Sequence, residues 1–206
     1  MKCFIFDLDN TPTAVQSTPL VKVLQWKRRC VENYLIDEKI IYDLLNDLGI
    51  SGGRIGSRGE TKQIFKDIAM SQLREVVAAH VYSAKNYENP GLRPREISGK
   101  AYDEVAKVLY ARLSVMQTQI GGLSEDSWCS KFNEECEAEE QARLGRWETD
   151  WELLCDGKRF FRDLHQRFKL KIATLRFKTM IVERMAREQT DSWIVMQKML
   201  SDALRV

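Results

Sequence analysis

Apolar residues recur at intervals of three or four along most of the chain, and this spacing predicts amphipathic helices. The predicted helices cover residues 21–36, 37–48, 61–84, 101–120, 125–156, 158–168 and 196–204. Asp37 is a suitable N-cap for the second of these helices, and Gly49 is a suitable residue to close it. The long middle part of the chain is therefore expected to be mostly helical.

Two shorter stretches have a different pattern and predict strands. The first, Cys3–Phe6, is a run of apolar and aromatic residues near the amino terminus. The second, Lys169–Thr174, follows the helix at 158–168 and ends in a hydroxyl residue. A helix that returns to a strand beside the first forms a right-handed β-α-β unit, so Thr174 is predicted to lie at the same sheet edge as Asp7.

Asp7 and Asp9 follow the first predicted strand directly and share one face of the extended chain. Ligands bind at the carboxyl edge of open α/β sheets, and Mg²⁺ prefers oxygen ligands. We therefore predict that Asp7 and Asp9 hold one Mg²⁺, with Asp7 as a nucleophile and Asp9 as an acid and base. A surface turn rich in Asp, Asn and Thr is the alternative interpretation of these residues.

The segment Phe6–Thr11 resembles motif I of the haloacid dehalogenase (HAD) superfamily, which is DxDxT after an apolar strand. Its second Asp is the version that the phosphatases of that family carry. The stretch from Gly157 through a helix to a strand ending in Thr174 is similar to motif II of the family, whose hydroxyl binds the transferring phosphoryl group.

The resemblance implies an α/β fold, with a small parallel-sheet, Rossmann-like core of HAD type and a large, mostly α-helical cap insertion. Residues 1–13 and 155–206 would form the core, and residues 14–154 would form the cap. The chain departs from the family after Thr174, where only 32 residues remain. The family's later lysine and acidic motif, which complete its Mg²⁺ site, are not recognisable there.

The resemblance also implies a function, the Mg²⁺-dependent cleavage of a phosphate monoester through an aspartyl-phosphate intermediate. The substrate would be a small phosphorylated metabolite or a nucleotide. The alternative is a truncated or degenerate relative without catalytic activity, a helical protein-interaction module that uses the acidic, tryptophan-bearing segment at 125–156. A catalyst needs a lysine or arginine near Asp7 and Thr174, together with a third acid, and an interaction module does not.

Composition and charge indicate the expected location and partners of the protein. The five cysteines form no CxxC pair, which argues against a disulfide framework or a zinc site and favours a cytoplasmic location. The first apolar run is too short for a membrane span, and the acids that follow it at once argue against a cleavable signal. The net charge of +2 and the scattered basic residues do not predict a nucleic-acid partner. A small sheet with exposed apolar surface favours a homodimer.

Overall fold

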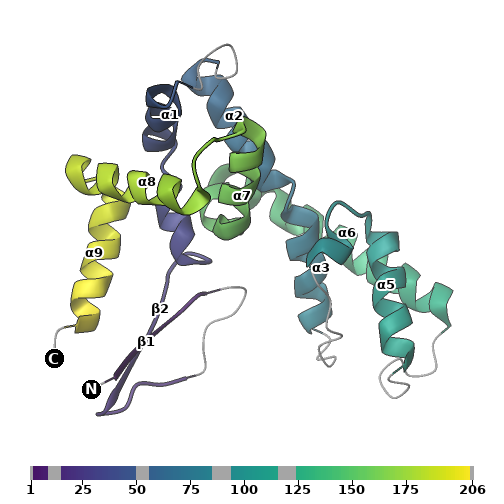
Figure 1. Cartoon of the computed structure of the whole chain (residues 1–206). Helices are drawn as coiled ribbons and strands as arrows, with labels where there is room; N and C mark the ends of the chain where they lie inside the picture. Colours follow the sequence, from purple (N-terminus) through teal and green to yellow (C-terminus); the bar gives the residue numbers. More distant parts are fainter. Residues whose placement is uncertain (1, 9–14, 50–55, 85–93, 116–123, 205–206) are drawn as a thin grey trace. The chain divides into compact units, whose positions relative to one another are not determined.

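The computed structural model describes residues 2–8, 15–49, 56–84, 94–115 and 124–204, which Figure 1 draws as ribbons. Helices contain 74% of the described residues. The strands in this part of the chain form one two-stranded parallel sheet. The predicted α/β class, with a Rossmann-like core of HAD type, is therefore wrong, because such a core needs several parallel strands covered by helices.

Most of the predicted helices are present. After strands β1 (Lys2–Phe6) and β2 (Val21–Gln25) comes a short 3-10 helix, η1 (Val31–Leu35). The α-helices are α1 (Glu38–Asp47), α2 (Arg58–Met70), α3 (Leu73–Ala84), α4 (Pro94–Ile97), α5 (Tyr102–Val115), α6 (Glu125–Leu154), α7 (Gly157–Phe168), α8 (Thr174–Glu188) and α9 (Asp191–Leu204). The Asp37 side chain accepts a hydrogen bond from the backbone of Ile40, which confirms the predicted N-cap.

The sheet pairs β1 with β2 in parallel, and Phe4 lies opposite Val23. We predicted a helix over residues 21–36, but its first five residues form β2 instead. Val21 and Val23 are β-branched, and the basic residues 27–29 interrupt the helical spacing, so the pattern fits a strand better than it fits one long helix. β1 is open to solvent, since Phe4 is 49% exposed.

The predicted strand at Lys169–Thr174 is also wrong. Lys169 adopts a left-handed conformation, with φ 49° and ψ 49°, and closes α7. The backbone amide of Leu170 bonds to the carbonyl of His165, a pattern that ends helices. Ala173 then caps α8, so Thr174 is the first residue of a helix. Residues 169–173 therefore form a tight connection between α7 and α8.

The chain divides into two compact units. The first unit contains residues 1–69 and 151–206, and the second contains residues 70–150. The predicted division into a core and a cap stays a prediction. No helix within the described ranges is both long and apolar enough to span a membrane.

Aromatic side chains fill the core of the first unit. Phe160 lies at its centre, with its ring centroid 5.5 Å from Phe161, 5.9 Å from Trp151 and 6.0 Å from Phe65. All four side chains are buried. These contacts join α2, the end of α6 and the start of α7, so the amino end of α7 is held firmly in place.

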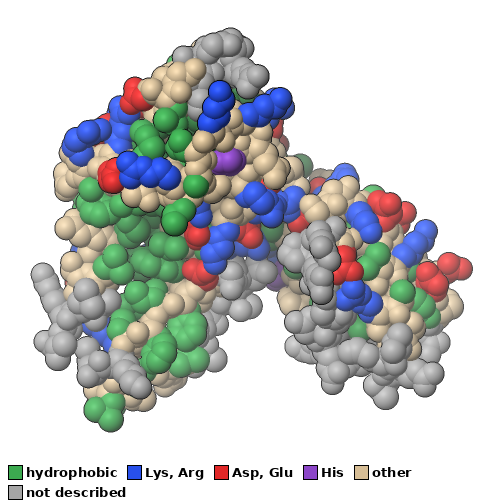
Figure 2. Space-filling view, in the orientation of Figure 1, with side chains coloured by type: hydrophobic (Ala, Val, Ile, Leu, Met, Phe, Trp, Pro, Cys, Tyr) green, Lys and Arg blue, Asp and Glu red, His purple; other side chains and the backbone are tan. Residues whose placement is uncertain are grey.

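Some apolar side chains of the first unit stay exposed. On α9 they include Ile194, which is 48% exposed, and Val195, and Figure 2 shows hydrophobic surface over this helix. In the second unit, Trp128 stacks on Phe132 with ring centroids 5.2 Å apart, and both are buried. Trp147 and Trp151, the other tryptophans of the predicted acidic surface, are buried as well.

An ion-pair cluster joins α1 to α8 on the surface of the first unit. Glu188 accepts hydrogen bonds from Lys39 at 2.7 Å and from Arg184 at 2.8 Å. Arg184 also reaches Asp47 at 2.6 Å. The hydrogen bond from Lys39, followed by that from Arg184, lowers the pKa of Glu188 to about 2.

This cluster predicts an acid-sensitive contribution to stability. A carboxyl whose pKa is lower in the folded chain stabilises that state above its ordinary pKa of 4.5, and the contribution is lost as the pH falls toward 2. Replacing Glu188 by Gln should therefore flatten the fall in Tm between pH 4.5 and pH 2, measured by circular dichroism. Asp150→Asn, at a more exposed pair with Arg146, is the control and should leave the fall unchanged. An unchanged slope in Glu188→Gln would contradict this role.

Candidate functional site

The structure brings a lysine to the first predicted site residue. Asp7 follows β1, and its Oδ2 accepts a hydrogen bond from Nζ of Lys158 at 2.8 Å. Lys158 lies in the first turn of α7, and its side chain is 59% exposed. The backbone carbonyl of Asp7 also accepts a hydrogen bond from the Gln25 side chain at 3.0 Å, which ties the end of β1 to the end of β2.

The other two predicted site residues have different outcomes. Asp9 lies outside the described residues. Thr174 is the first residue of α8, so it does not end a strand beside β1. The residue that the fold places against Asp7 is Lys158.

A second acid and a second lysine lie close to this pair. Oε1 of Glu32, on η1, accepts a hydrogen bond from Nζ of Lys178, on α8, at 3.1 Å. The Glu32 side chain is only 15% exposed. Its other oxygen, Oε2, is buried and has no well-formed hydrogen bond among the described residues, since only the Cys30 thiol, a weak donor, interacts with this carboxylate. A buried carboxylate oxygen without a well-formed hydrogen bond is costly and is a candidate ligand for a cation.

Glu32 and Asp7 act on the same lysine. The hydrogen bond to Asp7 is the largest cause of the raised pKa of Lys158, and the negative charges of Asp7 and Glu32 raise it further. We call Asp7, Glu32, Lys158 and Lys178 the charged cluster. It runs from the nearly buried Glu32 to the exposed Lys158, so a small solute can reach one side of it.

Asn33 connects the segments that carry the charged cluster. Its side chain is completely buried between η1 and the junction of α6 and α7. Its amide nitrogen donates to the backbone carbonyls of Glu152 at 2.8 Å and of Cys155 at 2.9 Å. Its amide oxygen accepts from the backbone N–H of Cys30 at 3.1 Å. These bonds join parts of the chain that are about 120 residues apart in sequence.

Gly157 allows the two segments to approach closely. A Cβ atom at this position would lie 2.8 Å from the backbone nitrogen of Asn33 and 2.9 Å from Cβ of Glu32. Such distances are too short for a side chain, so η1 and the start of α7 can pack this closely only with glycine here. Glu32 and Lys158 therefore come from two backbone segments in direct contact.

The charged cluster suits Mg²⁺ and a phosphate better than a metal held by protein alone. No group of three or more His, Cys, Asp or Glu side chains forms a metal site among the residues described. Mg²⁺ is commonly bound by one or two carboxylates together with waters and substrate phosphate oxygens. Asp7 and Oε2 of Glu32 fit that role, and the two lysines fit a phosphate. Burial raises the pKa of the nearby Cys30 thiol, so it stays protonated at neutral pH and is a poor metal ligand.

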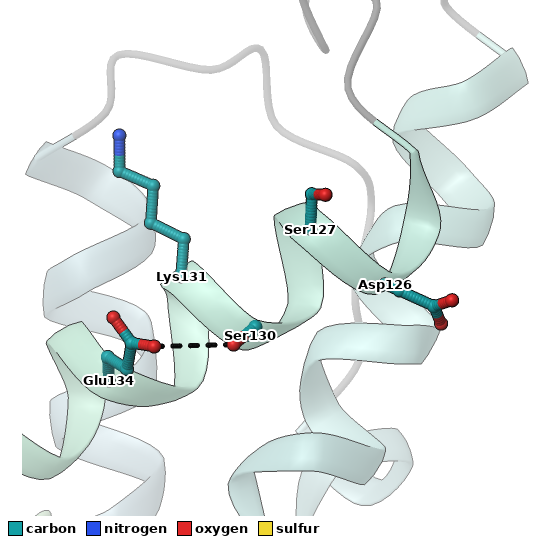
Figure 3. Close-up of a pocket in the computed structure, with 5 residues that line it drawn as sticks. All are labelled: Asp126, Ser127, Ser130, Lys131 and Glu134. Atoms are coloured by element: carbon teal, nitrogen blue, oxygen red, sulfur yellow. Dashed lines mark hydrogen bonds between the residues drawn. The ribbon is translucent and has the colours of Figure 1, made fainter.

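A hollow on the second unit offers no comparable arrangement. It is lined by Asp126, Ser127, Ser130, Lys131 and Glu134. Figure 3 shows these side chains on successive turns of α6, pointing in different directions, with one hydrogen bond between Ser130 and Glu134. Because the polar groups do not converge on one point, we do not treat this hollow as a site.

Comparison of the chain with known protein families, with curated proteins and with solved structures finds no match.

Sequence reasoning found Asp7 but missed three residues of the charged cluster. Lys158 lies in the stretch that was compared with motif II, yet its spacing gives no sign of contact with Asp7. Glu32 falls in the region that was predicted to be one helix, where a charged residue indicates a solvent face. The available signal is the pair Glu32-Asn33, which is polar and lies between apolar neighbours.

The close contact at Gly157 can be tested by adding a methyl group. Gly157→Ala should lower the free energy of unfolding by about 1–3 kcal/mol, because the new Cβ forces η1 away from α7. Gly145→Ala is the control, since no atom lies within 4 Å of its added Cβ and Ala is the better helix former by about 0.5–1 kcal/mol. Urea denaturation measures both variants. Equal stability of the Gly157→Ala variant and the wild type would contradict the packing.

Proposed function

We propose that the protein is a Mg²⁺-dependent hydrolase of phosphate monoesters and that the charged cluster is its active site. The single observation that carries the proposal is the Asp7–Lys158 ion pair beside the partly buried Glu32, whose Oε2 lacks a well-formed hydrogen bond. In this proposal, Lys158 is the lysine and Glu32 is the further acid that a catalyst requires near Asp7. The HAD-type fold gives no support, since the described residues do not form it.

Each member of the charged cluster has a proposed role. Lys158 and Lys178 neutralise phosphate oxygens, because ammonium groups bind phosphate through charge-assisted hydrogen bonds. Asp7 and Glu32 would hold Mg²⁺, which supplies Lewis-acid chemistry at the phosphate when bound. Asp7 also remains the proposed nucleophile, and the hydrogen bond from Lys158 holds its carboxylate in one orientation.

The sequence-based mechanism requires that Asp7 form a bond to phosphorus while the bond to the leaving alcohol breaks. Water then cleaves the aspartyl phosphate. Asp9 is the proposed acid and base for these steps, and the proposed substrate is a small phosphorylated metabolite or a nucleotide. Thr174 keeps its proposed phosphate-binding role only as a sequence prediction, since its placement at the start of α8 adds nothing in favour.

A protein-interaction module is the second candidate function. The tryptophans of the acidic segment are buried and do not supply its binding surface. The observation in its favour is the exposed apolar surface on β1 and α9, where Phe4 and Ile194 are each about half exposed.

The proposed activity is tested with p-nitrophenyl phosphate, with and without Mg²⁺. Wild-type turnover should require the metal. Asp7→Asn and Glu32→Gln should each lower kcat/KM by about 10²-fold or more, because each removes a charge at the site. Asp67→Asn, an exposed carboxylate on α2, is the matched control and should keep wild-type activity. Acid quenching during turnover should trap phosphate on the wild-type protein.

Three results would contradict the proposal. The first is the absence of metal-dependent turnover in folded wild-type protein. The second is turnover that Asp7→Asn retains, and the third is turnover that Glu32→Gln retains. Any of them shifts support to the interaction module.

A further inference from the structure

We infer that Asn33 is the positioning residue of the charged cluster, which sets the place of Glu32 relative to Lys158. This inference rests on the proposed function, because the cluster matters chemically only if it binds a metal and phosphate. Asn33 makes no described contact with Asp7, Lys158 or Lys178. Its effect is therefore transmitted through the backbone on either side of it.

The first step in the argument is the position of Asn33 in the chain. It directly follows Glu32 in η1, so a displacement of the Asn33 backbone also displaces Glu32. Its partner Glu152 lies in the last turn of α6, and its partner Cys155 directly follows that helix, three residues before Lys158. The two hydrogen bonds from its amide nitrogen therefore link the segment of one acid to the segment of one lysine.

The second step is the chemistry of the side chain. The amide uses two N–H groups as donors and its oxygen as an acceptor, and all of these are directed at specific partners. The Cys30 thiol donates to the same oxygen at 3.0 Å. An aspartate at this position has no N–H groups to donate, and an alanine has neither function. Either change leaves buried carbonyls unpaired, which drives the segments apart.

The third step is the tight packing around Asn33. Its side chain has no exposed surface, and a Cβ atom at Gly157 would lie within 3.0 Å of the backbone of residues 32 and 33. The contact between η1 and α7 has no space to absorb a change in Asn33 by local adjustment. The displacement passes to Glu32, whose buried Oε2 is a proposed metal ligand.

The test measures Mn²⁺ affinity by electron paramagnetic resonance and stability by urea denaturation, on the full chain. Asn33→Asp and Asn33→Ser should weaken Mn²⁺ binding about 10- to 100-fold, the range seen when outer-shell partners of a metal site are lost. Leu45→Ala, in the buried face of α1, is the stability control. It should destabilise the protein yet keep the wild-type Mn²⁺ affinity within about twofold, because it does not contact the cluster.

The outcomes separate this inference from the proposed function. Wild-type Mn²⁺ binding that is absent, or that Asp7→Asn and Glu32→Gln leave unchanged, overturns both. Binding that depends on Asp7 and Glu32 but is unaffected in the Asn33 variants overturns the positioning role alone. Equal loss of affinity in Leu45→Ala and the Asn33 variants also overturns it, since destabilisation then explains the effect. If Asn33→Asp does not fold, Asn33→Ser decides the question.

Discussion

The hydrogen bonds of the buried Asn33 side chain are the constraint on which the candidate site depends. Secondary structure alone does not fix the positions of η1, the end of α6 and the start of α7 relative to one another. The amide of Asn33 satisfies backbone groups from η1 and from the end of α6, and Gly157 removes the side chain that would keep α7 apart from η1. Buried polar groups need partners, so these bonds select one arrangement of the segments rather than merely adding stability.

The ion pairs of the charged cluster are expected to contribute little net stability. An exposed ion pair such as Lys158–Asp7 contributes only about 0–1 kcal/mol, because water screens it and the lysine loses side-chain freedom. The more buried Lys178–Glu32 pair has to offset the loss of hydration, and one Glu32 oxygen lacks a well-formed hydrogen bond to help do so. Apolar residues would stabilise this region more simply. In the proposed function, a bound cation and an anionic substrate would offset this loss of hydration.

Local sequence signals predicted the helices well and the strands poorly. Asp37 with Gly49 correctly bounded α1, and the spacing of Phe160, Phe161 and Leu164 correctly gave α7. The predicted strand at Lys169–Thr174 was wrong because Lys169, in a left-handed conformation, closes α7 and Ala173 caps α8. Lysine and alanine are not typical residues for these capping positions, so the sequence did not indicate them. At the site, Asp7 was predictable from its place after an apolar strand. Glu32 and Lys158 were not predictable, because the spacing of apolar residues carries no information on contacts between residues far apart in sequence.

The central claim is that Asp7 and Glu32 share a cation at the charged cluster. Crystals of the protein soaked with Mn²⁺ and inorganic phosphate test it most directly, because Mn²⁺ gives an anomalous signal that locates it without bias. We expect one strong anomalous peak within bonding distance of carboxylate oxygens from both Asp7 and Glu32. We also expect phosphate to contact Lys158 or Lys178. A peak elsewhere, or no peak at the cluster at saturating Mn²⁺, would contradict it.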